Sequence, residues 1–262
     1  MSGRRSIAVC TRLHYSNSMT AAVDVAKIVR FLDSAGRYAD AVVVAFGGTD
    51  AQLAELQACV DGWVGGERPA VTVLPVRPWG QFVGPLNALL GWVVQGSWDL
   101  ACFQSLEVRI DDPAAVLALA GAVEPDTLVA GAALCGHAFA VGTHAVNGRT
   151  VPWNTLAVWD ARKLGLLGFP LVADGRPGEG GFEGGVEEVA AVCSLQRLRP
   201  SDTRVKLLRI ASLATSWDVL FADPERAAWH DRKMVSKVTR PQAQLEAMGI
   251  FAGDVTHIDL AC

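Results

Sequence analysis

The sequence predicts an α/β fold in which a single doubly wound, mainly parallel sheet is flanked by helices and followed by a C-terminal helical segment. Two observations support this prediction. The first 125 residues alternate short apolar runs with stretches whose apolar residues recur at helical spacing, and the connections are short. That alternation favours βαβ crossovers and therefore a parallel sheet. The 262 residues are 51% hydrophobic, which is enough for one sizeable core.

Continuous apolar runs predict the strands of the first half. The clearest run covers residues 41–46, and its consecutive valines are typical of a strand that is buried on both faces. Gly47 and Gly48 interrupt it. The other strands are expected at 6–11, 70–76, 100–103 and 127–134.

Helices are predicted between these strands from apolar periodicity and capping residues. Residues 19–32 have helical spacing, with Asn17 or Ser18 as the N-cap. Thr49 or Asp50 is expected to cap a helix that runs to about residue 64. Two more helices are expected at 82–94 and 113–123, the second of them capped by Asp111 or Asp112.

The second half of the chain is less regular. Residues 174–185 hold six glycines and one proline in twelve positions, which predicts a mobile surface loop. Asn147-Gly148 indicates a turn within an irregular or hairpin segment. The remaining elements are expected to be a strand and helix within 153–167, a helix at 186–197, a last strand at 204–210 and a charged helical region at 223–248 that is broken at Pro241.

Composition restricts the function classes. The formal net charge of −4 provides no basic field, which argues against non-specific nucleic-acid binding. No apolar run approaches the ~18–20 residues of a membrane span, and the N-terminus lacks a secretory signal pattern. The six cysteines form no Cys-x-x-Cys pair and are interpreted as buried thiols, Cys135 among them. We therefore expect a cytoplasmic protein without a transmembrane segment.

Residues 99–113 are the most informative stretch. An apolar strand leads into the tripeptide Ser105-Leu106-Glu107, then a turn, then Asp112-Pro113 opening a helix. In this frame nucleotide-sugar glycosyltransferases carry their metal-binding Asp-x-Asp motif. The order of elements over roughly residues 5–240 resembles a family 2 glycosyltransferase of the A-type fold, with a degenerate Asp-x-Asp. The resemblance implies a glycosyltransferase A-like domain at 1–222, with a donor half at about 1–125 and an acceptor half at about 126–222, and a C-terminal helical extension at 223–262.

The resemblance also implies where the nucleotide-sugar donor binds, namely beyond the carboxyl ends of the parallel strands. The family's two aspartates at the end of the second strand are absent, and Ala45-Phe46 stands in their place. Trp79-Gly80 and Leu86-Asn87 match the family's next loop and helix in part. The expected donor-binding residues are Thr11, Arg12, Phe46, Trp79, Gly80, Asn87, Ser105, Glu107, Arg232 and Lys233.

In the family, the two aspartates hold Mg²⁺ or Mn²⁺ against the donor diphosphate. Here Ser105 offers only a hydroxyl, and Glu107 keeps one carboxylate. Glu107 and His230 are therefore expected to be weak metal ligands, unless arginine and lysine side chains hold the diphosphate alone. A solvated amphipathic helix remains the alternative for the segment around His230.

The catalytic prediction concerns two acids at the start of a helix. Glu187 and Glu188 stand where the family has an acidic pair behind the acceptor site, and in inverting members one such carboxylate removes the acceptor proton. Adjacent helical residues point about 100° apart, so only one is expected to face the site. The family's pattern favours Glu188. The alternative is a pair of solvated acids at a helix start.

The resulting function is inverting sugar transfer from a nucleotide-diphosphate sugar to a hydroxyl of a small-molecule or glycan acceptor. The alternative is a catalytically inactive glycosyltransferase-like protein that binds a partner or regulates one. A third reading keeps catalysis with another donor, such as a lipid-phosphate-linked sugar. Thr11-Arg12-Leu13-His14 replaces a glycine-rich phosphate loop, which disfavours a nucleotidyltransferase. The sequence does not decide whether the chain binds a protein partner or forms a homodimer. It favours an enzyme over a protein without activity.

Overall fold

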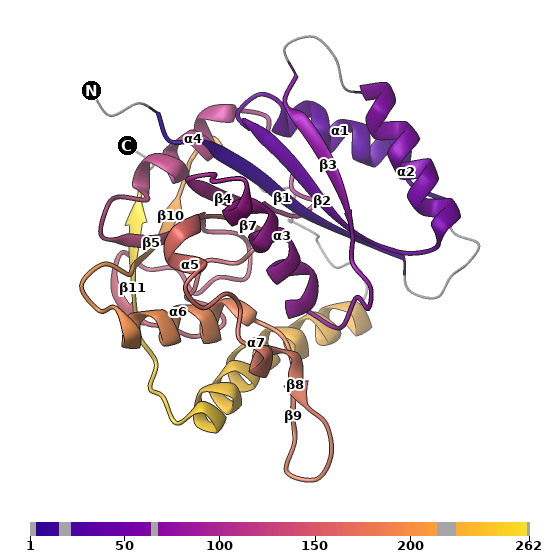
Figure 1. Ribbon diagram of the computed structural model, residues 1–262. Coiled ribbons are helices and arrows are strands. Elements are labelled where there is room, and N and C mark those ends of the chain that lie inside the picture. Colours follow the sequence, from indigo (N-terminus) through magenta and orange to yellow (C-terminus); the bar gives the residue numbers. More distant parts are fainter. Residues whose placement is uncertain (1–3, 16–21, 64–67, 214–223, 261–262) are drawn as a thin grey trace.

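The computed structural model describes residues 4–15, 22–63, 68–213 and 224–260, and for 224–234 it describes the backbone only. Within these ranges the centre of the molecule is a nine-stranded sheet in the order β3-β2-β1-β4-β7-β5-β10-β11-β6 (Figure 1). Its strands are β1 (Ile7–His14), β2 (Ala41–Gly47), β3 (Ala70–Pro75), β4 (Leu100–Gln104), β5 (Thr127–Ala132), β6 (Gly142–Ala145), β7 (Leu156–Asp160), β10 (Arg204–Arg209) and β11 (Asp254–Asp259).

The predicted doubly wound, mainly parallel sheet is confirmed. Strand β1 pairs in parallel with both β2 and β4, and β2 pairs in parallel with β3. Every residue of β2 is buried, as its run of valines predicted. Strand β7 is antiparallel to its neighbours β4 and β5, and β6 is antiparallel to β11. The carboxyl ends of β1, β2, β3 and β4 therefore meet at one edge of the sheet.

Helices follow most strands, and local capping sets where they begin. Asp24 caps the first helix by accepting a 2.9 Å hydrogen bond from the Lys27 backbone N–H, whereas the predicted caps Asn17 and Ser18 lie outside the described residues. Asp112 caps the fourth helix. The helices are α1 (Val25–Ala35), α2 (Asp50–Trp63), α3 (Val83–Gln95), α4 (Pro113–Ala122), α5 (Ala161–Leu164), the 3₁₀ helix η1 (Leu171–Asp174), α6 (Glu187–Leu198) and α7 (Pro224–Met248).

The C-terminal region differs from the prediction in two ways. Helix α7 runs through Pro241 without a break; Pro241 is buried, and it and Leu245 line one largely apolar cavity. That burial offsets the one backbone hydrogen bond that the proline removes. Strand β11 was not predicted, although it lies in the sheet between β10 and β6. Its inward residues are Val255 and His257, and a buried histidine interrupts the apolar alternation by which a strand is recognised.

Two smaller expectations can also be compared with the structure. The glycine-rich segment forms a short hairpin, β8 (Gly175–Arg176) and β9 (Phe182–Glu183), which projects from the body below α7 in Figure 1. Cys10 and Cys102 are buried thiols as predicted, but Cys135 is exposed because β5 ends at Ala132 and the chain then turns outward.

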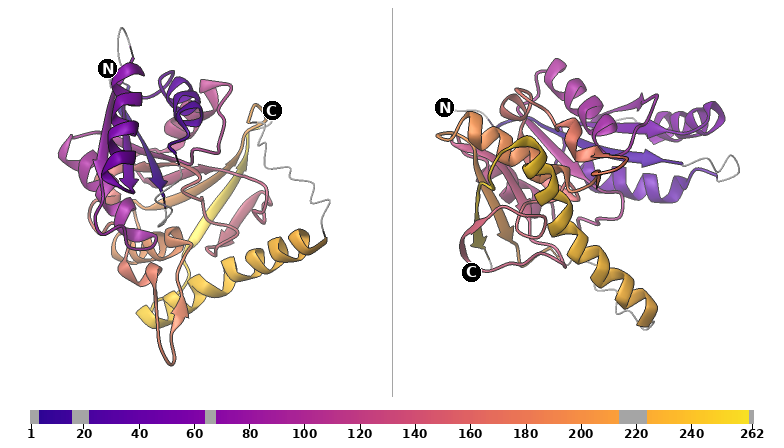
Figure 2. Two further views of the ribbon diagram at one scale, coloured as in Figure 1. Left: turned by 90° about the vertical axis from the view of Figure 1, so that its right-hand side faces the viewer. Right: turned by 90° about the horizontal axis from the view of Figure 1, so that it is seen from below.

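Helices α6 and α7 pack on each other, and both contact η1. Figure 2 shows that the N-terminal part of α7 extends away from the rest of the molecule, while its C-terminal part lies against the body. No helix in the described part of the chain is long and apolar enough to cross a lipid bilayer.

Candidate active site

A cavity of about 130 Å³ lies at the carboxyl ends of β1 and β4. We call it the strand-end cavity, and its polar lining consists of Thr11, Arg12, Gln104, Ser105, Glu107 and Asn154. Parallel pairing of β1 with β4 brings these side chains together, although 94 positions separate Thr11 from Ser105. The structure thus brings four of the predicted donor-binding residues to one place: Thr11, Arg12, Ser105 and Glu107.

A second cavity, of about 290 Å³, adjoins the first. We call it the charged cavity because Arg12, Glu187, Glu188, Lys237 and Arg240 line it, together with Trp153 and Asn154. Arg12 and Asn154 line both cavities, so a ligand in one would lie next to a ligand in the other.

Among the acids that line the charged cavity, Glu188 has the most strongly shifted pKa. Its side chain is buried, and its Oε1 accepts a 2.6 Å hydrogen bond from the Asn154 backbone N–H. Burial, followed by the neighbouring charge of Glu187, raises the pKa of Glu188 to about 8, against the opposing effects of that hydrogen bond, of a second one from the backbone of Glu188 itself, and of Lys237. A carboxyl group with such a pKa can both accept and release a proton near neutral pH.

Glu187 is also buried, and its Oε1 lies 3.6 Å from Nη1 of Arg12. The expectation that only one of the two acids faces the site is wrong, since both line the charged cavity. The reason is that the cavity lies over the N-terminal end of α6, where Gly185 and Val186 also line it, and not along one side of the helix.

Two buried polar atoms at the strand-end cavity have no hydrogen-bond partner among the described residues. They are Oγ1 of Thr11 and Nδ2 of Asn154. The Asn154 amide is held in place from its other end, because its Oδ1 accepts a 3.0 Å hydrogen bond from the Trp159 indole. Buried donors and acceptors are nearly always paired in folded proteins, with protein groups or with ordered water, so these two atoms can bond to a water molecule or to a ligand in the cavity.

The residues at the expected metal position do not fit a divalent cation. The carboxylate of Glu107 is paired with the ammonium of Lys27, on α1, at 2.7 Å. Ser105 contributes a neutral hydroxyl, whereas Mg²⁺ and Mn²⁺ prefer several anionic oxygen ligands. No group of three or more histidine, cysteine or acidic side chains that could hold a metal occurs within the described ranges. The side chain of His230 lies outside them.

Other predicted donor-binding residues have structural partners of their own. Phe46 is 1% exposed and belongs to the core. The Asn87 amide bonds both backbone groups of Phe169, at 2.8 and 2.9 Å, and so fixes the turn after α5. Gly80 lies in a loop with φ of +73°. The side chains of Arg232 and Lys233 lie outside the described residues.

Trp79 and His14 form a stacked pair beside the strand ends, with ring centroids 4.7 Å apart and an interplanar angle of 5°. Gly47 makes room for the pair, because a Cβ there would lie 2.5 Å from Cε3 of Trp79. This pair is the aromatic surface that a nucleobase could meet at the ends of β1 and β2.

Sequence reasoning missed Asn154 and Lys237, which line these cavities, and Lys27, which pairs with Glu107 beside them. Lys27 lies on the predicted first helix, where nothing in the sequence distinguishes it from an ordinary surface lysine. Only the tertiary structure places it beside Glu107. Asn154 and Lys237 stood in segments that resembled the family but were not selected as site residues. The one signal for Asn154 in the sequence was the resemblance of the segment Pro152-Trp153-Asn154 to a strand of the glycosyltransferase family.

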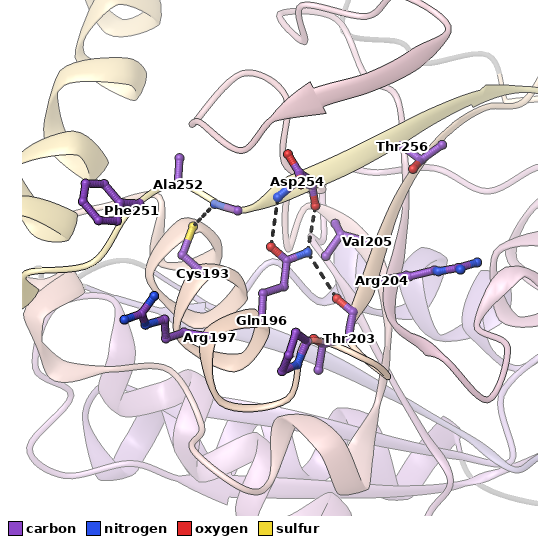
Figure 3. Close-up of a pocket in the computed structure, with 12 residues that line it drawn as sticks. Cys193, Gln196, Arg197, Thr203, Arg204, Val205, Phe251, Ala252, Asp254 and Thr256 are labelled. Atoms are coloured by element: carbon purple, nitrogen blue, oxygen red, sulfur yellow. Dashed lines mark hydrogen bonds between the residues drawn. The ribbon is translucent and has the colours of Figure 1, made fainter.

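A further cavity of about 400 Å³ lies between the C-terminal half of α6 and the start of β11 (Figure 3). Its polar groups bond to one another. The side chain of Gln196 donates to the backbone oxygens of Thr203 and Asp254 and accepts from the Asp254 N–H, and Sγ of Cys193 accepts from the Gly253 N–H (Figure 3). These bonds join α6 to β11, so we assign this cavity a structural role.

Comparison with known proteins shows the fold. No family model and no curated protein sequence matches the chain. Among solved structures, a mannosyltransferase from Pyrobaculum calidifontis, determined with GDP-mannose and Mn²⁺, matches with a TM-score of 0.52 and 14% identity over 75% of this chain and 53% of its own. A 4-diphosphocytidyl-2C-methyl-D-erythritol synthase from Anaerococcus prevotii matches with a TM-score of 0.52 and 10% identity, over 89% of this chain and 100% of its own. The chain thus spans about half the length of the mannosyltransferase, and its fold is the A-type fold of nucleotide-diphospho-sugar transferases.

Proposed function

On this A-type fold, we propose that the chain transfers a sugar from a nucleotide-diphosphate donor to a hydroxyl group of an acceptor, with inversion at the anomeric carbon. In this proposal the diphosphate end of the donor lies at the strand-end cavity, because its volume of about 130 Å³ is too small for the whole donor, and the acceptor occupies the charged cavity. In this proposal the reacting atoms meet near Arg12 and Asn154, which line both cavities.

The observation that carries the proposal is the position of Glu188. It is a buried carboxyl group in the wall of the charged cavity, next to the strand ends where ligands of such sheets bind. Its raised pKa suits a group that accepts a proton from a hydroxyl. The Asn154 backbone N–H fixes one oxygen of this carboxyl group.

The chemical step then balances without a metal. The acceptor oxygen attacks the anomeric carbon, the bond from that carbon to the diphosphate oxygen breaks, and the hydroxyl proton passes to Glu188. Arg12 lines the strand-end cavity, where it can contact the departing diphosphate, and Lys27 neutralises the carboxylate of Glu107, which reduces the repulsion between that carboxylate and the diphosphate. No step is assigned to Mg²⁺ or Mn²⁺, because the residues at that position do not fit them.

The alternative, a partner-binding protein without activity, would gain support from an exposed apolar patch over the donor site. The sequence places Phe46 and Trp79 in that patch; the side chain of Phe46 is buried, whereas Trp79 is half-buried and stacks on His14. The partner-binding alternative is therefore kept as one outcome of the experiment.

The experiment measures release of nucleoside diphosphate from a panel of UDP-, GDP- and dTDP-sugars by the wild type, Glu188→Ala and Glu179→Gln. Glu179 is an exposed acid in the glycine-rich hairpin and serves as the control. We expect Glu188→Ala to lower turnover at least ~100-fold, which is the lower range for loss of a general base. Near-normal turnover in this variant would refute the role of Glu188, and a folded wild type that turns over none of the donors would favour the partner-binding alternative or a non-nucleotide donor.

A further inference from the structure

We propose that uncharged hydrogen-bond donors hold the donor diphosphate at the strand-end cavity, in the place of a divalent cation. The three side chains are Thr11, Ser105 and Asn154, which line that cavity together. This inference rests on the proposed function and extends it to the groups that bind the diphosphate. Its support is the position of the three side chains, the hydrogen bonds that two of them lack, and the charges beside them.

The three side chains lie at one edge of the sheet, on neighbouring strands. Thr11 belongs to the second half of β1, and Ser105 directly follows β4, which pairs in parallel with β1. Asn154 lies two residues before β7, and β7 is antiparallel to β4, so the start of β7 meets the end of β4. A 2.9 Å hydrogen bond from the Ser105 backbone N–H to the Thr155 oxygen joins these two strand ends. The strand order β1-β4-β7 thus places Thr11 and Asn154 on the two sides of Ser105.

Thr11 and Asn154 have hydrogen-bonding capacity that the described part of the chain leaves unused. Thr11 is 2% exposed and Asn154 is 5% exposed, yet Oγ1 of the first and Nδ2 of the second have no partner there. The Trp159 indole donates a 3.0 Å hydrogen bond to Oδ1 of Asn154, which orients the amide so that Nδ2 is the group left over. An amide nitrogen only donates hydrogen bonds, so its missing partner is an acceptor such as a phosphate oxygen or a water oxygen.

The charges beside the cavity are compatible with a diphosphate. The carboxylate of Glu107 is paired with the ammonium of Lys27 at 2.7 Å. The guanidinium of Arg12 lines the cavity, where its Nη1 donates a 3.2 Å hydrogen bond to the Phe82 oxygen and lies 3.6 Å from Oε1 of Glu187. Both contacts use Nη1, one of the three nitrogens that carry the five N–H groups of a guanidinium. The one acid of the lining is therefore neutralised, and Arg12 adds a charged donor to the three uncharged ones.

The positions relative to Glu188 assign the three donors to the diphosphate. Thr11 and Ser105 line the strand-end cavity but not the charged cavity, where Glu188 lies. Asn154 lines both cavities, at the place where the bond between the anomeric carbon and the diphosphate oxygen breaks in the proposed reaction. As that bond breaks, its electron pair stays on the diphosphate oxygen, and a hydrogen bond from Nδ2 stabilises the developing charge without transfer of a proton. Thr11 and Ser105 donate to the other phosphate oxygens.

The test compares a nucleoside diphosphate with its nucleoside, so that contacts to the phosphates are measured apart from contacts to the base and ribose. Calorimetric titrations of the full chain in EDTA use UDP with uridine, GDP with guanosine and dTDP with thymidine. Asn154→Asp exchanges Nδ2 for an oxygen and keeps Oδ1 for the Trp159 indole, and Thr11→Val removes a hydroxyl that has no partner. We expect each variant to lower the affinity for the diphosphate that binds the wild type at least about tenfold, and the affinity for its nucleoside less than about twofold, since a hydrogen bond to a charged group is worth roughly the first factor or more.

The matched control is Thr256→Val, which removes a threonine hydroxyl from the exposed side of β11 and should change neither affinity. Unchanged diphosphate affinity in both Asn154→Asp and Thr11→Val would show that Nδ2 and Oγ1 bond to water only, and would overturn this inference while leaving the proposed function intact. Equal losses for the diphosphate and the nucleoside would overturn it as well, because they would indicate a disturbed fold. Absence of all binding by a folded wild type would overturn both proposals.

Discussion

Replacing Glu188 with glutamine should change how stability depends on pH. The folded protein raises the pKa of Glu188 to about 8 from an ordinary value of 4.5. Between these two values the folded chain keeps a proton that the unfolded chain has released. The free energy of unfolding therefore falls as pH rises through this window, and the stabilisation is fully present only below the lower value.

The magnitude follows from the same shift. One pKa unit corresponds to about 1.4 kcal/mol, so complete ionisation of Glu188 removes roughly 4 to 5 kcal/mol, and less if Glu187 and Lys237 adjust. Glutamine keeps the acceptor oxygen for the Asn154 N–H but cannot ionise. Glu188→Gln should thus lose several kcal/mol less stability than the wild type between pH 5 and pH 9.

The assay is urea unfolding at about five pH values across that range, followed by the fluorescence of the eight tryptophans. Glu179→Gln, which changes an exposed acid, is the control and should follow the wild type. If wild type and Glu188→Gln lose stability in parallel as pH rises, Glu188 is not a buried acid with a raised pKa and the reasoning fails.

Three further outcomes are expected. The kcat/KM of sugar transfer should rise with pH through about 8 and then level, as the Glu187–Glu188 pair ionises; a flat profile from pH 6 to 9 would contradict proton transfer to this pair. Lys27→Gln should weaken nucleoside diphosphate binding about tenfold at low salt, because it leaves the charge of Glu107 unbalanced, and unchanged affinity would exclude Lys27 from the donor site. Gly47→Ala should destabilise the chain by roughly 1–3 kcal/mol by displacing the His14–Trp79 stack, whereas Gly62→Ala, which meets no atom within 4 Å, should not; thermal unfolding of both variants compares them.

Local sequence patterns were sufficient to predict most helices and strands of the fold. Consecutive valines identify β2, and aspartate before proline identifies the start of α4, because burial and capping act over a few residues. The break expected at Pro241 did not occur, and β11 was missed, because tertiary burial decides both cases. A buried proline and a buried histidine look the same in a sequence as exposed ones.

The candidate site was less accessible to sequence reasoning. The resemblance selected Glu188 and Glu107, but not the contacts that give these acids their chemistry. The pairing of Lys27 with Glu107 joins residues that are 80 positions apart, and the bond from Asn154 to Glu188 joins residues 34 apart. Neither pairing has a local signal in the sequence. The sequence could not decide whether Phe46 packs in the core or contacts a ligand, and the burial of its side chain places it in the core.

The most direct test of the account is calorimetric titration of the wild type with UDP, GDP and dTDP, each with Mn²⁺, with Mg²⁺ and with EDTA. The account predicts that one nucleotide binds and that EDTA leaves its affinity unchanged within about twofold, because the ammonium of Lys27 pairs with the one carboxylate at the metal position. Binding that requires Mn²⁺ or Mg²⁺ would contradict the metal-free donor site, and a folded chain that binds none of the three would contradict the donor site itself.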